Sequence, residues 1–432
     1  MSTRWTLHVE NFAKIKSADI EIAPFVGIVG ENNTGKSYLM SLLWGLMTFP
    51  AIPFDIEMDT SCEPYRKCKN IVESHHEASF ILSEEEKRVF IEYFNACLRI
   101  NKSEILQTAF NYKVKADAIE IREYSSNVTY RVTFSLGKLT NSQGVKRECD
   151  HFAGFRDASP GSFLALSRML LLQGIGNVSW FSGAHFFPAS RTGFMLTYPQ
   201  LVGQSLEDNY SLATEPRTKT QLTLPYIRFL QFITSYKEAE DNNPDEPFAD
   251  FVENELTHGR IMSTEAKMPV LTYRPDGSEK NLPLHVSSSV VTEVAPLLMA
   301  FRDKEKRGVY FIEEPEAHLH PELQKKMAQL LIRMSNGGKG VFITTHSDTI
   351  IQHINNMLML GKTDSKDLMT KYGYKTEDLL KTENVKLYQF VHDEDGMSIL
   401  MPLEKTDYGF VVPTFNDSLK NLLDETYAFQ GE

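Results

Sequence analysis

Apolar and polar residues alternate near the N-terminus, as they do in half-buried strands. Residues 5–12 and 18–22 follow this alternation, whereas Phe25–Val29 is a short run without polar residues. Alternation places every second side chain on one face of a sheet, and an uninterrupted apolar run indicates a strand that is buried on both faces. Residues 38–47 are apolar on nearly every side, so we predict a helix enclosed in a core after this strand.

Helix-like and strand-like segments alternate along the rest of the chain. In the middle we predict a charged helix over 84–99, alternating strands over 110–137, an apolar helix over 162–173, an aromatic strand over 180–188 and a helix-rich stretch to about residue 262. Toward the C-terminus we predict strands over 309–312 and 340–344, helices from Pro321 and after Ser347, and a strand pair over 385–391 and 397–401. Strands alternating with helices around a buried sheet predict an α/β layer architecture.

Composition narrows the class of protein. The chain has 432 residues, of which 42% are hydrophobic, which is enough for a substantial core. Its net charge of −12 argues against a surface that is basic overall, so DNA could be held only by a local patch. The basic runs 66–69 and 304–307 are candidates for such a patch, although solvated faces explain them more simply.

Cysteine usage and the N-terminal segment bear on the compartment. Four cysteines in a chain of this length do not resemble a secreted disulfide framework. Cys62, Cys68, His75 and His76 match no common zinc-ligand spacing, so buried or surface thiols are the better interpretation. No basic leader precedes an apolar run and no apolar segment reaches membrane-spanning length, so we expect a cytoplasmic protein without membrane association.

A complete phosphate-binding loop follows the buried strand at Phe25–Val29. Its residues fit G-x-x-x-x-G-K-S between a strand and an apolar helix, which is the context that the motif requires: Gly30, Glu31, Asn32, Asn33, Thr34, Gly35, Lys36 and Ser37. The glycines let the backbone wrap closely around phosphates, and successive N–H groups point at the anion. Lys36 would reach the β and γ phosphates of ATP, and Ser37 would offer its hydroxyl to Mg²⁺.

Two further strands end in polar residues. The strand over 309–312 delivers Glu313 and Glu314 to the sheet edge at which open α/β sheets bind ligands. We expect Glu313 to hold Mg²⁺ or its water, and Glu314 to orient or deprotonate the attacking water. The strand over 340–344 ends near His346, which can hydrogen-bond a terminal phosphate.

With GENNTGKS, FIEEPEAHLHP and TTHSD in this order, the chain resembles the ABC-type ATPases of the RecF, SMC and OLD group. The resemblance implies a P-loop NTPase fold, an ABC-type ATPase head with an antiparallel β lobe and helical insertions. It divides the chain into a core (1–48 and 268–405), a β lobe with a helical insertion (49–160), a helical lobe (161–267) and a C-terminal tail that is a candidate partner-binding segment (406–432).

The resemblance also implies that two heads close around ATP, each completing the other's site with a signature segment. Residues 286–290 occupy that place, and Ser287, Ser288 and Ser289 are the candidates, although the usual glycine is absent. A plain helix cap is the alternative interpretation. Residues 317–320 would cross the dimer interface, and 187–191 resemble the segment that couples the nucleotide to the inserted lobe, with Arg191 as a candidate near the site.

Only 86 residues follow His346, and Asp393 and Asp395 form the single D-x-D of that tail. A hairpin turn between the last two predicted strands explains them better than a metal-binding nuclease site. The resemblance to the RecF, SMC and OLD group then implies an ATPase that forms homodimers or higher homo-oligomers through its ATP sites and gates a separately encoded nuclease or toxin in anti-phage defence. A RecF-like DNA-repair clamp and an OLD-type metal-dependent nuclease are the alternatives.

Overall fold

The computed structural model describes ten stretches of the chain: residues 3–48, 57–75, 79–134, 151–175, 183–198, 222–239, 243–264, 269–363, 365–413 and 423–429. Within them, a nine-stranded sheet runs through the molecule in the order β5-β1-β2-β15-β14-β3-β13-β12-β8. The strands of this sheet are β1 (Thr3–Phe12), β2 (Ile15–Glu21), β3 (Phe25–Val29), β5 (Ala118–Ser126), β8 (Ala184–Phe187), β12 (Val309–Glu313), β13 (Gly340–Thr345), β14 (Val385–His392) and β15 (Ser398–Pro402).

The sheet has a parallel part and an antiparallel part. From β14 through β3, β13 and β12 to β8, neighbouring strands are parallel. At the other end β2, β1 and β5 are paired antiparallel, and the β14–β15 hairpin joins the two parts because β15 lies parallel to β2. The predicted α/β architecture is therefore confirmed, and the parallel part aligns the carboxyl ends of β3, β13 and β12 at one edge.

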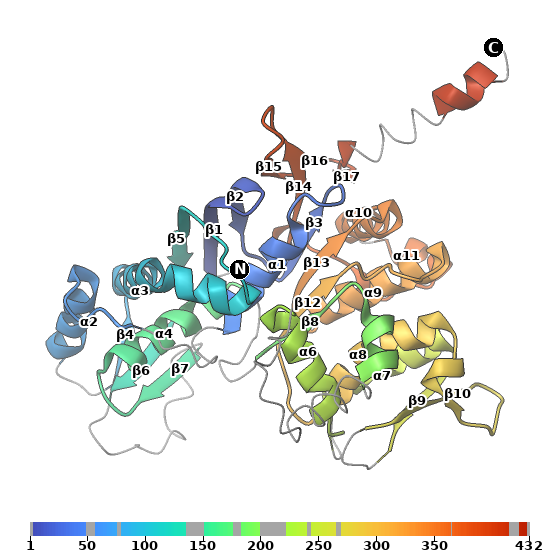
Figure 1. The fold of residues 1–432 in the computed structure, drawn as a ribbon, viewed down its shortest axis with the longest axis horizontal. Coiled ribbons are helices and arrows are strands. Elements are labelled where there is room, and N and C mark those ends of the chain that lie inside the picture. Colours follow the sequence, from blue (N-terminus) through green and yellow to red (C-terminus); the bar gives the residue numbers. More distant parts are fainter. Residues whose placement is uncertain are drawn as a thin grey trace, which may run out of the picture.

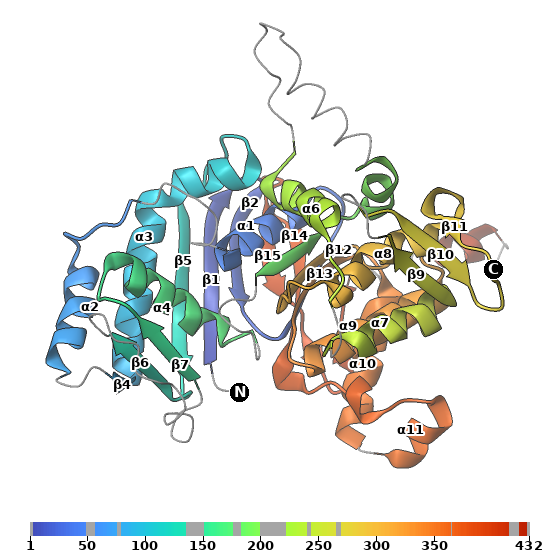
Figure 2. The same ribbon diagram turned by 90° about the horizontal axis from the view of Figure 1, so that it is seen from below.

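Helices cover both faces of this sheet (Figures 1 and 2). The helices are α1 (Lys36–Thr48), α2 (Glu63–Ser74), α3 (Glu84–Phe110), α4 (Pro160–Leu172), α6 (Leu224–Ser235), α7 (Glu246–Phe251), α8 (Ser289–Arg302), α9 (Pro321–Asn336), α10 (Asp348–Thr363) and α11 (Lys366–Tyr372). A π-helical turn, Val252–Thr257, continues α7, and residues 191–198 are also helical.

Alternate side chains of the central strands pack into two hydrophobic cores, one on each face of the sheet. In β3, Val26 and Ile28 pack with α1, α3 and α4, whereas Phe25 and Val29 pack on the opposite face with α8, α9 and α10. β13 is divided in the same way, with Phe342 in the first core and Val341 and Ile343 in the second. A strand buried on both faces needs apolar residues at every position, which is why these segments lack polar alternation.

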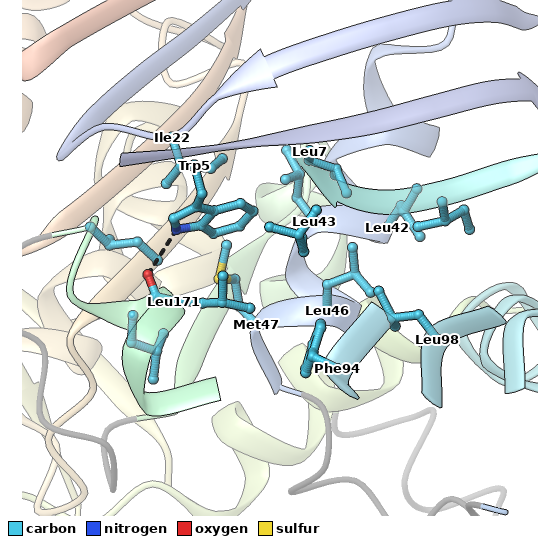
Figure 3. Packing of buried hydrophobic residues seen from close by; sticks show 14 of the residues in the cluster. Trp5, Leu7, Ile22, Leu42, Leu43, Leu46, Met47, Phe94, Leu98 and Leu171 are labelled. Atoms are coloured by element: carbon cyan, nitrogen blue, oxygen red, sulfur yellow. Dashed lines mark hydrogen bonds between the residues drawn. The ribbon is translucent and has the colours of Figure 1, made fainter. Parts of the chain in front are cut away.

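The first core encloses α1, as the apolar surface of this helix predicts. Figure 3 shows Trp5 packed among Leu43, Met47 and neighbouring apolar side chains, with its indole Nε1 donating a hydrogen bond to the carbonyl oxygen of Leu171 at 2.9 Å. Within α1 only Ser37 and Tyr38 are exposed. The helix is therefore exposed only at its N-terminus, directly after the phosphate loop.

Three smaller sheets lie outside the large one. They are formed by β4 (Ser79–Leu82), β6 (Tyr130–Phe134) and β7 (His151–Phe155), by β9 (Gly259–Ser263), β10 (Leu271–Pro275) and β11 (Leu282–Pro283), and by β16 (Lys405–Thr406) and β17 (Gly409–Phe410). The predicted strand region 110–137 is described to residue 134 and contains β5 and β6, which belong to different sheets, because β5 pairs with β1 whereas β6 pairs with β4 and β7. Alternation predicts strands but carries no information about which partner each strand takes.

Candidate active site

The phosphate loop connects β3 to α1 and contains three residues with positive φ angles, a conformation that glycine and asparagine adopt more readily than other residues. Gly30 and Gly35 have φ angles of 151° and 104°, and Asn33 has a φ of 65°. A Cβ atom on Gly35 would lie 2.8 Å from Cγ1 of Ile15, so a larger residue would both strain the backbone and clash. Asparagine tolerates the left-handed region better than most residues, which suits it to position 33.

Lys36 points back into this loop. Its Nζ donates to the carbonyl oxygens of Gly30 at 2.9 Å and Glu31 at 2.6 Å. Burial disfavours the ammonium form and lowers the pKa of Lys36 to about 8, although Glu314, Glu316 and Glu313 oppose this shift. The loop therefore holds a cation that is only partly neutralised, at the position where the motif places phosphate oxygens.

Three strand ends converge at this loop (Figure 1). β13 lies between β3 and β12, with Thr345 beside Val29 and Thr344 beside Glu313. Since parallel strands share their carboxyl edge, Gly30, Glu314 and His346 follow these strands side by side. The sheet thereby brings together residues that are far apart in the sequence.

Glu313 is a buried carboxylate at the end of β12, with 1% of its surface exposed. Its Oε2 accepts a hydrogen bond from the Tyr226 hydroxyl at 3.0 Å, whereas Oε1 has no hydrogen-bond partner among the residues that the structure describes. Burial raises the pKa of Glu313, while the nearby hydroxyls of Ser37 and Tyr226 counteract this shift. A buried, unsatisfied carboxylate oxygen beside a serine hydroxyl fits a hard divalent cation such as Mg²⁺.

Glu314 and His346 lie next to each other, at the ends of the adjacent strands β12 and β13. His346 Nε2 lies 3.8 Å from Glu314 Oε1. Burial and the charge of Lys36 lower the pKa of His346, so the imidazole is neutral at pH 7 and can donate one N–H. Glu314 has a φ of 44°, and its N–H donates to the Thr344 carbonyl at 2.9 Å. This unusual backbone turns the Glu314 carboxylate out of the strand toward the loop.

Two further glutamates support the site, although neither is predicted as a site residue from the sequence. Glu316 Oε1 accepts the backbone N–H of His346 at 2.6 Å and so connects the two strand ends. Glu293, on α8, forms an ion pair with Arg191 at 2.6 Å. Glu316 could have been suspected from the sequence because it lies only two residues after Glu314. Glu293 lies in an apolar helix, where a lone acidic residue was the only hint.

Arg191, which the sequence suggested as a neighbour of the site, contacts its backbone directly. Its Nη1 donates to the carbonyl oxygen of Glu313 at 2.6 Å, and its Nη2 donates to that of Glu314 at 3.0 Å. The guanidinium is buried, with 4% of the side chain exposed. The residue therefore lies behind the acidic strand end and cannot itself reach solvent.

The serines at the start of α8 lie apart from this cluster within the chain. Ser288 caps the helix, with its hydroxyl accepting the N–H of Val291 at 3.4 Å, and Ser287 donates from its hydroxyl to the Pro283 carbonyl. This geometry is the helix cap that the alternative interpretation predicts. Ser288 and Ser289 are nevertheless exposed, and their helix start faces away from the core.

The carboxylates of the tail are engaged in a hairpin turn between β14 and β15. Asp393 Oδ1 accepts the N–H groups of Asp395 and Met397 at 3.0 and 2.8 Å, and its Oδ2 pairs with Lys16 at 2.6 Å. His76 of the cysteine–histidine set lies outside the described residues. Across the described part of the chain, no group of three or more His, Cys, Asp or Glu residues is placed to hold a metal ion, and no helix is long and apolar enough to span a membrane.

The chain is similar to several known proteins. Over 88 residues, 20% of this chain, the sequence is 30% identical to the Old nuclease of Escherichia phage P2, of whose length the matched segment spans 15%. Among solved structures, an Smc head bound to the C-terminal winged-helix domain of ScpA matches with a TM-score of 0.39 and 13% identity over 92% of this chain and 97% of the other. The SMC head domain of Thermotoga maritima matches with a TM-score of 0.35 and 11% identity over 94% and 100%.

A family model described as the AAA ATPase domain matches residues 205–351. The matched segment contains Glu313, Glu314 and His346, whereas the phosphate loop lies before it. A domain of this type implies ATP as the ligand of the site. Two of the three strand ends that meet at the phosphate loop thus belong to a segment with the sequence features of an AAA ATPase domain.

Proposed function

We propose that this protein is a Mg²⁺-dependent ATPase that closes as a dimer around ATP and gates a separate effector. The observation that carries the proposal is the convergence of Lys36, Ser37, Glu313, Glu314 and His346 at one sheet edge. Each residue has the chemistry that one part of phosphoryl transfer requires. The AAA ATPase match supports the choice of ATP.

Binding would rest on the loop and on Lys36. The N–H groups of the loop from Asn32 to Gly35 and the start of α1 would cradle the phosphates, because a helix N-terminus favours anions. Thr34, whose hydroxyl donates to the Glu31 carbonyl at 2.9 Å, holds the loop in shape. Lys36 would exchange its two carbonyl acceptors for phosphate oxygens.

Ser37 and Glu313 would hold Mg²⁺, which when bound neutralises charge on the β and γ phosphates. The free Oε1 of Glu313 suits this role, and the Tyr226 hydroxyl fixes the orientation of the carboxylate. A carboxylate whose other oxygen is hydrogen-bonded presents its remaining oxygen in one defined direction. Tyr226 is therefore a positioning residue in this proposal.

Glu314 and His346 would act on the γ phosphate. Glu314 would accept a proton from a water as the water oxygen bonds to the γ phosphorus and the bond to the β–γ bridging oxygen breaks, releasing ADP and phosphate. Neutral His346 would donate its N–H to a γ-phosphate oxygen and steady the Glu314 carboxylate, which lies 3.8 Å away. Glu316 would hold the His346 backbone.

The dimer would place Ser287–Ser289 of one subunit against the γ phosphate of the other. The exposure of Ser288 and Ser289 at the start of α8 supports this arrangement, because a capped helix start with nearby hydroxyls is a suitable anion site. We further propose that dimer closure gates a separately encoded nuclease or toxin in bacterial anti-phage defence, in the cytoplasm. The similarity to a phage nuclease supports the defence context.

The first experiment is steady-state ATP hydrolysis by the full-length protein with Mg²⁺ and with EDTA. We expect phosphate release that requires Mg²⁺ and is lost in Lys36→Ala, together with loss of ATP binding in that variant. Size-exclusion chromatography with ATP should show dimers or larger species. ATP binding without hydrolysis, in the presence of nucleic acid and of the neighbouring gene product, would disprove the enzymatic part and leave a nucleotide-binding scaffold.

A further inference from the structure

Arg191 and Glu293 form a buried ion pair between two elements with different roles. Glu293 lies one helical turn after Ser289 on α8, and its side chain is 1% exposed. Glu293 Oε1 pairs with Arg191, while its Oε2 accepts the N–H and the hydroxyl of Thr192 at 3.1 and 2.7 Å. Among the described residues, Oε1 has this ion pair and no hydrogen bond, whereas Oε2 accepts two hydrogen bonds, so Glu293 links α8 to the segment at 191–192.

The same Arg191 guanidinium also holds the backbone of the acidic strand end, with Nη2 shared between Glu293 and the Glu314 carbonyl. It donates to the carbonyl oxygens of Glu313 and Glu314, and also to that of Pro188 at 3.2 Å. The Glu314 residue is held on its second side by its N–H bond to Thr344. A non-glycine residue with positive φ is strained, so these contacts are what keep the Glu314 carboxylate in place.

We propose that the Arg191–Glu293 ion pair is a coupling element that links α8, and with it Ser287–Ser289, to the position of Glu314 in the same subunit. This inference rests on the proposed function, in which those serines contact the ATP of the partner. ATP bound in one site then determines the position of the Glu314 carboxylate in the other site. The ion pair would join the contact of α8 with the partner's ATP to the position of Glu314, and such a link gives reciprocal coupling between the two ATP sites.

The same helix supplies a matched control. Arg302, at the end of α8, forms a comparable ion pair with Glu253 at 3.0 Å and with Glu246 at 2.8 Å. Among the residues that the structure describes, Arg302 forms no hydrogen bond or ion pair with Glu313 or Glu314. Disruption of this second ion pair should lower stability without disturbing Glu314. Comparison of the two ion pairs therefore separates a positioning role from general support of α8.

The kinetic test uses Arg191→Lys, Arg191→Ala and the near-isosteric Glu293→Gln in the full-length protein. We expect kcat to fall about 10- to 100-fold, since small displacements of a reacting group have effects of this size. The dissociation constant for ATP should change less than twofold, and any Hill coefficient above one should fall toward one. Arg191→Ala should be the most severe because lysine retains the charge. If kcat stays within twofold, or falls no further than in Arg302→Lys, the coupling role is disproved.

A second measurement does not depend on hydrolysis. Hydrogen exchange of the peptide covering 309–317, without nucleotide, should be at least about 10-fold faster in Arg191→Lys than in the unmodified protein, and unchanged in Arg302→Lys. Equal exchange in all three proteins would disprove the pinning of the strand end. If the three proteins differ in exchange as expected but the unmodified protein hydrolyses no ATP, the proposed function is disproved and the structural link between Arg191 and the strand end is retained.

Discussion

His346 Nε2 lies 3.8 Å from Oε1 of Glu314, and the backbone N–H of His346 donates to Glu316 at 2.6 Å. Besides the bond from the Glu314 N–H to the Thr344 carbonyl, these two contacts join the end of β13 to the end of β12. Because β12 and β13 are paired in parallel, the two residues that would act on the γ phosphate keep a fixed separation. Their chemical roles can be separated by mutation.

Glu314→Gln removes the proposed proton acceptor while retaining shape and hydrogen-bonding capacity. We expect ATP to bind with unchanged affinity and kcat to fall by about 100- to 10,000-fold, which is the usual range for a general base. The variant should accumulate as an ATP-bound dimer, measured by light scattering and by the nucleotide content of the dimer peak. His346→Ala should lower kcat by about 100-fold, as for the loss of one stabilising donor. A Glu314→Gln protein that hydrolyses ATP normally would contradict the assignment.

The lowered pKa of Lys36 predicts a pH dependence of ATP binding. In the free protein burial sets this pKa at about 8, and bound phosphates favour the protonated form, so the pKa is higher in the complex. Affinity should therefore be constant below pH 8 and should fall as the pH rises above it, by about tenfold per pH unit for one coupled proton. Calorimetry from pH 6.5 to 9.5 measures this slope.

Lys36→Arg is the control for that titration, because arginine keeps its charge throughout this range. The variant should bind ATP more weakly, since the planar guanidinium group does not fit between the carbonyl oxygens of Gly30 and Glu31. Its affinity for ATP should not decline above pH 8. An identical decline in both proteins would mean that another group titrates.

Tyr226→Phe removes the hydroxyl that orients Glu313 and leaves the ring in place. We expect the Mg²⁺ concentration for half-maximal hydrolysis to rise about 10- to 100-fold, as for the loss of an outer hydrogen bond to a metal ligand. The affinity for ATP in EDTA should not change. Tyr236→Phe, at the C-terminal end of the same helix, is the matched control and should leave the Mg²⁺ dependence unaltered. Equal effects of both substitutions would argue against a specific role for Tyr226.

Ser288→Arg tests the proposed contact between subunits. A long cation at the exposed start of α8 should prevent close approach of a second subunit while leaving the phosphate loop of its own subunit intact. We therefore expect normal ATP binding by the monomer, with loss of ATP-dependent dimers in sedimentation velocity and loss of hydrolysis. Ser74→Arg introduces the same change at an exposed serine of α2 and should be silent. Dimers that persist in Ser288→Arg would refute the interface.

The local pattern of the chain predicted the elements of the site more fully than their surroundings. β3, α1 and β12 follow from unbroken apolar runs and a glycine loop, because burial on both faces imposes such runs directly on the sequence. The hairpin turn at Asp393 and Asp395 was predictable in the same way, since turn residues act locally. The helix cap at Ser288 likewise follows from its own neighbours.

Partners from distant segments could not be predicted in this way. The contacts of Tyr226 with Glu313 and of Arg191 with Glu293 join residues separated by 87 and 102 positions, and no periodicity in the sequence predicts them. Likewise, the stretch 110–137 was predicted as strands, but its division between two sheets depends on which edges the rest of the chain leaves open.

The amino-acid sequence alone is enough to predict a phosphate loop between a buried strand and a buried helix, and two later strands that end in acidic and histidine side chains. These features are local, because backbone conformation and burial act on consecutive residues. The position of β13 between β3 and β12, the hydrogen bond from Tyr226 to Glu313 and the link from α8 through Arg191 to Glu314 become visible only in the folded chain. Those relationships arise from the packing of segments that are distant in the chain, and packing is a property of the whole fold.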